Sequence, residues 1–410
     1  MLREDAAGSG YERAPGHFDE YLVRVGRGTP CGELMRRYWQ PVGVSETLGS
    51  TPRRVRILDE DLILFRDGQG RAGLFHERCC HRGTSLYFGR VEDEGLRCCY
   101  HGWLFDVRGR CLEQPCEPEG GRARDKVRQP WYPVEERYGL VFAYLGPLDS
   151  MSPLPRYDIL ENLAPGERLV VEGSTFYVGG PHNEDNPHAP YSWLQNWENV
   201  VDSYHVVVLH STLSGTQFRR EFEVMPKVEW VKMDHGIAAL SRRPLPDGRE
   251  FYRVTQTLLP NIRIVPTIEL REGLGREIAW LVPVGDDSHR TFGVAVVQEG
   301  EESPFTRRSR IANFNGKIWT EMTEEEHRDF PGDYEAQYSQ GPITLHSEEH
   351  LATSDRGLMM LRRLLRRQIE TVEKGGHPLG AGPSPESVEV RIQAGNFFPE
   401  PTGTGEQAQA

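Results

Sequence analysis

The sequence predicts an α+β protein of two domains, and three observations support this prediction. The chain has 410 residues, which is enough for two cores of ordinary size. Between residues 41 and 146, short runs of β-forming residues alternate with turns marked by glycine, a pattern typical of a small antiparallel β domain. Beyond residue 155, longer β-rich runs are mixed with a few helical patterns. We therefore expect a small β domain followed by a larger domain of strands and helices.

The elements follow from local patterns in the order of the chain. Residues 1–20 form a polar arm, and Gly32–Tyr38 form a short helix because Leu34 and Tyr38 share one face. In the β domain we expect strands at 61–65 and 139–145, with a proline-containing linker at 151–155. Longer strands are expected at 168–178, 220–233, 251–259 and 290–298. The predicted domain boundaries are 1–40 for the arm and helix, 41–150 for the β domain, 151–395 for the second domain and 396–410 for a flexible tail.

The strongest helical pattern runs from Asp355 to Val372. Leucine and isoleucine side chains recur on one stripe of this helix, with Leu361 and Leu365 at its centre. Ser354 can cap its first turn, and the glycines at 375 and 376 end it.

Two short motifs in the first quarter of the chain carry metal-ligand residues. They are Cys79-x-His81 and Cys98-x-x-His101, and sixteen residues separate them. Two thiolates and two imidazoles can hold a [2Fe–2S] cluster, with the cysteines on one iron and the histidines on the other. Structural zinc is the alternative, but zinc motifs commonly pair cysteine with cysteine and histidine with histidine. The motifs therefore predict a Rieske centre, which relays single electrons.

The composition of the chain indicates its cellular compartment and excludes some classes of partner. Of the seven cysteines, two are assigned to iron, and the other five form no convincing disulfide framework, which fits a reducing compartment. The first thirty residues lack the apolar run of a signal peptide. No stretch approaches the 18 consecutive apolar residues of a membrane span. We therefore predict a cytoplasmic protein. The net charge of −13 argues against nucleic acid as a partner, because phosphate binding needs a basic surface.

A second metal motif lies in the larger domain, at Asp202, His205 and His210. On a regular helix, His205 and His210 would point about 140° apart, so one metal can bind both only at an irregular turn or a helix end. Two histidines at this spacing are more often structural than functional when they stand alone. A Rieske relay, however, needs a site that consumes its electrons. In that context the pair predicts an iron site of two histidines and one carboxylate that activates O2.

Together these motifs resemble those of the α subunits of Rieske non-haem iron oxygenases, also called ring-hydroxylating oxygenases. The resemblance covers nearly the whole chain and is strongest to the phthalate-dioxygenase-like branch, through residues 32–41, 128–133 and 341–355. It implies an N-terminal Rieske domain and a catalytic domain of the helix-grip (START/Bet v 1-like) type with a large antiparallel sheet and helices. It also implies one [2Fe–2S] cluster and one mononuclear Fe(II) in each subunit.

The resemblance further implies a carboxylate ligand far downstream of the two histidines. Asp333 is the candidate, because it begins the segment that ends in Gly-Pro-Ile at 341–343. Glu335 lies two residues beyond it, and Glu198 and Asp202 lie near the histidines. These three residues are the alternatives.

Two further residues acquire expected roles from the resemblance. Asp202 would hold the second ring nitrogen of His205, as carboxylates near metal sites commonly do. It would also bridge His205 to His81 or His101 of a neighbouring subunit and so relay electrons between chains. Asn199 resembles the asparagine that lies beside the iron in this family.

The predicted function is that of a terminal oxygenase component. It would use O2 and electrons from a separate NAD(P)H-dependent reductase that carries flavin and an iron–sulfur centre, alone or with a ferredoxin, because the chain has no convincing nicotinamide-binding motif. The substrate would be aromatic and undergo ring or angular dioxygenation. The alternative is a Rieske monooxygenase that removes methyl groups from aromatic ethers or amines. A closed homotrimer would satisfy a head-to-tail relay between subunits.

Sequence alone does not identify the substrate. Arg219, Arg220 and Arg263 could each pair with a substrate carboxylate. For all three the favoured interpretation is a solvated surface charge, because arginine is mostly exposed in proteins.

Overall fold

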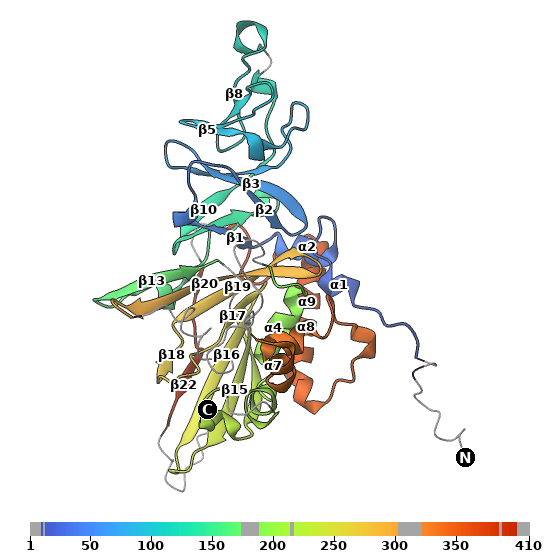
Figure 1. Ribbon diagram of the computed structural model, residues 1–410, viewed down its shortest axis with the longest axis vertical. Helices are drawn as coiled ribbons and strands as arrows, with labels where there is room; N and C mark the ends of the chain where they lie inside the picture. Colours follow the sequence, from blue (N-terminus) through green and yellow to red (C-terminus); the bar gives the residue numbers. More distant parts are fainter. Residues whose placement is uncertain are drawn as a thin grey trace.

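A computed structural model describes residue 10 and residues 13–122, 124–173, 188–213, 217–301, 322–384 and 388–399. A small β domain stands at one end of a larger domain that contains a long sheet and helices (Figure 1). The predicted α+β class and the order of the two domains agree with this arrangement.

Three antiparallel sheets build the N-terminal domain. The first contains β1 (Trp39–Val44), β11 (Leu140–Tyr144) and β10 (Val134–Arg137). The second contains β2 (Arg53–Ile57), β3 (Glu60–Arg66), β4 (Ala72–His76) and β9 (Trp131–Tyr132). The third contains β5 (Arg90–Glu92), β6 (Gly95–Arg97), β7 (Leu104–Phe105) and β8 (Cys111–Glu113). Because β1 pairs with β11 along its length, the first and last strands of the domain close it into one unit.

A nine-stranded sheet forms the frame of the second domain. Its main path is β13 (Glu167–Glu172), β20 (Ser288–Gln298), β19 (Glu277–Gly285), β17 (Ile262–Ile264), β16 (Glu250–Leu258), β15 (Gly236–Pro244) and β14 (Lys227–Met233). Two further strands, β18 (Gly273–Leu274) and β22 (Gly395–Phe397), join it beside β16. Every pairing in this sheet is antiparallel. Separately, β12 (Arg156–Tyr157) and β21 (Glu389–Val390) form a short parallel pair.

Helices cover one side of this sheet (Figure 1). The α-helices are α1 (Glu20–Val23), α2 (Pro30–Met35), α3 (Asp158–Glu161), α4 (Trp193–Val201), α5 (His205–Val207), α7 (Glu324–Asp329), α8 (Asp333–Tyr338) and α9 (Arg356–Glu373). A buried core joins α4 and α9 to the sheet. The indole nitrogen of Trp197 donates to the carbonyl of Ile262 at 3.0 Å, which fixes α4 across strand β17.

Most predicted elements are present, with three differences. Residues 220–223 form a 3₁₀ turn rather than the start of a strand, and β14 begins only at Lys227. Asp355, not Ser354, occupies the N-cap position of α9. The predicted tail from residue 396 begins inside β22, because Asn396 is fully buried and its side-chain oxygen accepts from Arg253 at 2.7 Å. Part of the predicted strand 168–178 and residues 400–410 lie outside the described residues.

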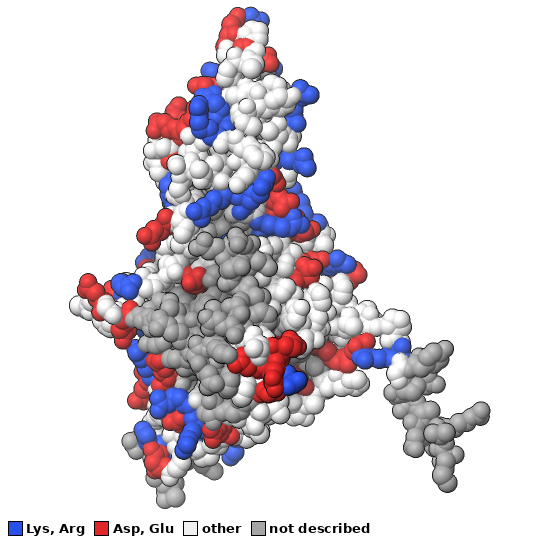
Figure 2. All heavy atoms as spheres, in the orientation of Figure 1, with Lys and Arg blue, Asp and Glu red and all other residues white. Residues whose placement is uncertain are grey.

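The charge of the chain is unevenly distributed over the visible face. Acidic atoms gather at α7, whose first turn carries Glu324, Glu325 and Glu326, and a band of Lys and Arg atoms crosses the molecule at the level of β2 (Figure 2). The net charge of −13 therefore does not describe the surface that any one partner would meet. No helix in the described part of the chain combines the length and hydropathy of a membrane span.

Candidate metal centres

The two cysteine–histidine motifs form a matched pair of tight loops. In the first, the Gly83 amide donates to the Cys79 carbonyl at 2.8 Å, and in the second, the Gly102 amide donates to the Cys98 carbonyl at 3.1 Å. Gly83 and Gly102 both adopt left-handed backbone angles, with φ of 77° and 71°. Residues other than glycine rarely tolerate such angles, so glycine lets both loops turn back within two residues of the histidine.

Across the two loops, the cysteine thiols lie beside each other and the histidine rings lie beside each other. Cys79 and Cys98 are each 3 % exposed, and the neighbouring Cys79 thiol together with burial raises the pKa of Cys98. The imidazoles of His81 and His101 are half-buried, with ring centroids 4.5 Å apart. The indole of Trp103 stacks on His81 at 4.3 Å and holds its ring plane. The two thiols therefore lie in the interior and the two imidazoles at the rim.

This separation suits a two-iron cluster better than a single zinc ion. One zinc ion needs four ligand atoms that converge on one point. The described residues contain one set of three or more such ligand atoms within 4.8 Å of each other, and it lies in the other domain. A [2Fe–2S] cluster takes its thiolates on one iron and its imidazoles on the other. The pairing of thiol with thiol and of ring with ring fits that requirement.

The set in the second domain depends on a break in the helix. Helix α4 ends at Val201, and Asp202 adopts an extended conformation. The short helix α5 then begins at His205 and passes into a π-helical segment, Val208–Leu213, that contains His210. A π-helix closes i→i+5 hydrogen bonds, so it brings residues five apart closer to one face than an α-helix does. The irregular turn expected between the two histidines is therefore present.

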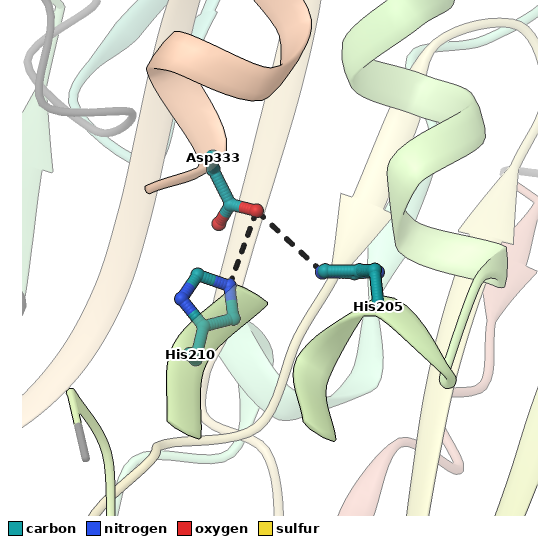
Figure 3. Close-up of side chains that lie close together, drawn as sticks. All are labelled: His205, His210 and Asp333. Atoms are coloured by element: carbon teal, nitrogen blue, oxygen red, sulfur yellow. Dashed lines mark hydrogen bonds and ion pairs between the residues drawn. The ribbon is translucent and has the colours of Figure 1, made fainter. Parts of the chain in front are cut away.

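Three side chains converge beside this segment (Figure 3). The Oδ1 atom of Asp333, at the start of α8, lies 3.2 Å from Nε2 of His210 and 3.5 Å from Nε2 of His205. One ligand atom from each of the three residues lies within 4.8 Å of the others. Two imidazoles and a carboxylate on one side of a metal are the ligand set of non-haem Fe(II) enzymes that activate O2.

The electrostatics of this cluster favour a bound cation. Burial alone would lower the pKa of His205, but the carboxylates of Asp202 and Asp333 raise it to about 10. Burial would raise the pKa of Asp333, but the adjacent His210 and His205 hold it well below its usual range. Asp333 is therefore a carboxylate at neutral pH, and the site attracts positive charge. A proton on His205 supplies positive charge at this site, and a divalent metal ion would displace that proton.

The alternative carboxylates are engaged elsewhere. Glu335 accepts from Nδ1 of His327 at 2.7 Å, and Glu198 forms an ion pair with Arg362 at 2.6 Å. Asp202 faces the other ring nitrogen of His205, with 3.5 Å between Oδ2 and Nδ1. The geometry thus favours Asp333 as the third ligand and places Asp202 behind His205.

Amide side chains complete the surroundings of the cluster. Asn199 donates from Nδ2 to Oδ1 of Asp333 at 3.1 Å, so the expected asparagine does lie beside the ligands. Gln217 and Phe218 contact the ring of His210. Phe218 is one of the candidate pocket-wall residues that sequence suggests, whereas Gln217 was missed, because it lies seven residues beyond His210 and belongs to no ligand-spacing pattern.

The expectation for one of the three arginines was wrong. Arg219 and Arg220 are exposed, as expected. Arg263, in contrast, is only 5 % exposed and donates from Nη1 to Oδ1 of Asn196 at 2.8 Å. It lies on the central strand β17, whose side chains are covered by α4, and this neighbour could not be inferred from the local sequence.

Comparison with known proteins identifies the class. A family profile described as the Rieske [2Fe-2S] domain matches residues 38–133. Among solved structures, NdmA of Pseudomonas putida CBB5 with caffeine aligns with a TM-score of 0.63 over 85 % of this chain and 94 % of its own. At 20 % identity, this likeness supports the fold alone. The chain thus contains a Rieske domain followed by a second domain.

Curated relatives narrow the family. The phenoxybenzoate dioxygenase subunit alpha of Ectopseudomonas oleovorans is 53 % identical over 96 % of this chain and 94 % of its own length. The phthalate 4,5-dioxygenase oxygenase subunit of Pseudomonas putida is 28 % identical over 88 % of this chain and 87 % of its own length. The chain belongs to the Rieske non-haem iron oxygenases, as an oxygenase α subunit of the phthalate-dioxygenase-like branch. Enzymes of this family carry a [2Fe–2S] cluster and a mononuclear iron, and this assignment extends to the present chain.

Proposed function

We propose that this chain is the terminal oxygenase of a multicomponent system that acts on an aromatic carboxylate. Cys79, His81, Cys98 and His101 would hold the [2Fe–2S] cluster; His205, His210 and Asp333 would hold the mononuclear iron. The observation that carries the proposal is the convergence of these last three side chains on one point. When bound, the cluster supplies single electrons and the mononuclear iron supplies O2-activating chemistry.

Arg263 supports a substrate with a carboxylate group. Its guanidinium contacts Asn196, and Asn199 one helical turn later contacts Asp333. Residues three apart on a helix are neighbours on one face, roughly 5 Å apart. A substrate carboxylate beside Arg263 would therefore place its ring within reach of the iron ligands. An arginine fork also matches a carboxylate with two parallel hydrogen bonds. The relative with 53 % identity is named for phenoxybenzoate, an aromatic carboxylate.

The arrangement of the domains supports electron transfer between chains. In Figure 1 the third sheet of the N-terminal domain, β5–β8, lies near the top of the view, whereas helices α7 and α8 lie well below it beside the large sheet. The side chain of Asp202 is 36 % exposed. The imidazoles of His81 and His101 are half-buried at the rim of the two loops. All three side chains are therefore accessible to another subunit. A head-to-tail homotrimer would bring Asp202 of one chain to the Rieske histidines of the next. A separate reductase, alone or with a ferredoxin, would supply electrons from NAD(P)H.

Oxygen-labelling experiments test the reaction type. The purified chain with a flavin and iron–sulfur reductase, NADH and 3-phenoxybenzoate under ¹⁸O₂ should consume O2 and yield a product with two labelled oxygens. Release of formaldehyde from a methoxybenzoate, with one labelled oxygen in the formaldehyde, the other in water and none in the phenol, would instead support the demethylase alternative. A chain that holds two irons rather than three, and consumes no O2 with any aromatic acid, would refute the oxygenase proposal.

The Arg263→Gln variant tests the substrate class. The loss of a hydrogen bond to a charged group costs roughly 1.5–3 kcal/mol, so KM for the carboxylate should rise about 10–100-fold. KM for the corresponding neutral amide should change little, and exposed Arg219→Gln serves as the matched control. An equal rise in KM for the acid and for the amide would show that Arg263 does not bind the substrate carboxylate.

A further inference from the structure

The ring of His210 has a separate neighbour at each nitrogen. Nε2 points to Asp333, and Nδ1 lies 2.8 Å from Oε1 of Gln217. His210 is only 3 % exposed, so the protein rather than bulk water determines where its ring proton lies. To bind a metal through Nε2, a neutral imidazole must carry its proton on Nδ1.

Hydrogen bonding fixes which atom of the Gln217 amide faces His210. Nε2 of Gln217 donates to the carbonyl oxygen of Pro331 at 3.0 Å. A backbone carbonyl can only accept, so the amide nitrogen must face Pro331 and the amide oxygen must face His210. The amide orientation follows from this network of partners. An acceptor oxygen beside Nδ1 selects the tautomer that leaves Nε2 free to bind a metal.

Gln217 also links the two segments that carry the ligands. Its backbone amide donates to the carbonyl of His210 at 2.8 Å, so the backbone of Gln217 is held against that of His210. Its side chain reaches Pro331, two residues before Asp333. The adjacent Phe218 stacks on the imidazole of His210, with ring centroids 4.2 Å apart and planes inclined by 25°. The ring is thus held at its edge by Gln217 and across its face by Phe218.

We infer that Gln217 is a positioning residue of the mononuclear iron site, which sets the tautomer of His210 and ties its loop to the segment that carries Asp333. This inference rests on the proposed iron ligands. It also explains an asymmetry, because His205 is backed by the charged Asp202 and His210 by a neutral amide. The neutral partner orients His210 without adding a second negative charge behind the ligands.

Metal titration of two variants tests the inference independently of catalysis. The full-length protein is stripped of its mononuclear metal and titrated with Co(II) or Fe(II), while visible absorbance reports the Rieske cluster. Gln217→Leu removes the acceptor and should weaken metal affinity by about 10–100-fold with an unchanged Rieske spectrum. Gln217→Glu keeps an acceptor oxygen beside Nδ1 but loses the amide that donates to Pro331, so it should lose clearly less affinity than Gln217→Leu. This rescue separates orientation of the ring from a merely structural effect.

Gln256→Leu is the matched control. Gln256 is 1 % exposed, and its side-chain oxygen accepts from the backbone amides of Gln393 and Ala394, away from the iron ligands. This variant should lose stability without losing metal affinity. If Gln217→Leu is not recovered folded, Gln217→Met, which has similar length and no amide oxygen, takes its place.

The outcomes separate this inference from the proposed iron site. If Gln217→Leu or Gln217→Met binds Co(II) as tightly as the unaltered chain, the inference is wrong. Equal losses in Gln217→Glu and Gln217→Leu would also overturn the argument from the tautomer. If metal binding by the unaltered chain is not reduced by removal of the Asp333 carboxylate, then the proposed ligand set itself is wrong.

Discussion

The Rieske loops and the iron site differ in how far apart their residues lie in the chain. All four candidate cluster ligands fall within residues 79–101, on two loops with the same backbone turn. The proposed iron site joins His210 to Asp333, which are 123 residues apart, and it needs a broken helix to bring His205 alongside. The residues of the Rieske loops come from one short stretch of sequence. The residues of the proposed iron site come together only after the sheet and helices have assembled. The two sites should therefore fail differently when single residues are changed.

The largest expected effect is loss of the cluster in Cys98→Ala. Cys98 is buried and its thiol faces that of Cys79, so the change removes one of the two interior thiols. The variant should be colourless and lack the Rieske electron paramagnetic resonance signal after reduction. Cys99→Ala is the control, because the Cys99 side chain is exposed. A brown Cys98→Ala protein, or a colourless unaltered protein with stoichiometric zinc, would contradict the cluster assignment.

Asp333→Ala should abolish oxygenase activity and mononuclear iron binding while the Rieske signal remains. Its carboxylate oxygen is the atom that both histidines approach, so no other described group closes the ligand set. Metal analysis should show the loss of one iron per chain. Glu335→Ala is the control, because that carboxylate is engaged by His327. Loss of iron in Glu335→Ala but not in Asp333→Ala would move the ligand by two residues.

These two predictions show how much could be inferred from sequence. The candidate Rieske ligands and the pair His205 and His210 could be proposed from sequence, because each depends on spacing within a few residues, and the irregular turn expected between the two histidines is present. Asp333 was a candidate only through a family resemblance. Gln217 and the burial of Arg263 could not be predicted, because each depends on contacts between segments that are distant in sequence. Sequence spacing describes local geometry, but not which distant segment covers it.

Asp202→Asn should have a smaller effect, on the link between the two sites rather than on either one. Asp202 faces Nδ1 of His205 and is not one of the three converging ligands, so both metal centres should stay filled. The loss of its charge should slow electron transfer into the iron by at least about tenfold, as for other residues that support metal ligands. Rapid mixing of reduced, substrate-bound enzyme with O2 would measure Rieske reoxidation. Unchanged reoxidation in a fully metallated variant would mean that electrons follow another route.

The smallest expected effect concerns an ion pair beside the second Rieske loop. Arg97 donates to the carbonyl of Gly102 at 2.6 Å and to the carboxylate of Glu92 at 2.7 Å, so Glu92 steadies the arginine that holds this loop. Arg97 and Arg90 lower the pKa of Glu92 from 4.5 to about 2. A carboxylate with a lowered pKa in the folded state stabilises the protein above pH 4.5, and this contribution is lost as pH falls from 4.5 towards 2. Glu92→Gln should therefore lower the free energy of unfolding by about 1 kcal/mol at pH 7.

Chemical unfolding of Glu92→Gln and the unaltered chain at several pH values would measure this contribution. The difference between the two proteins should be largest at pH 7 and should shrink as the pH falls below 4.5, because protonation then removes the same charge from the unaltered chain. Glu119→Gln is the matched control, since Glu119 pairs with Arg122 on the exposed surface, away from Gly102. A difference between Glu92→Gln and the unaltered chain that stays constant with pH would show that Glu92 acts through packing. The local contacts of the Rieske loops would then be steric rather than electrostatic.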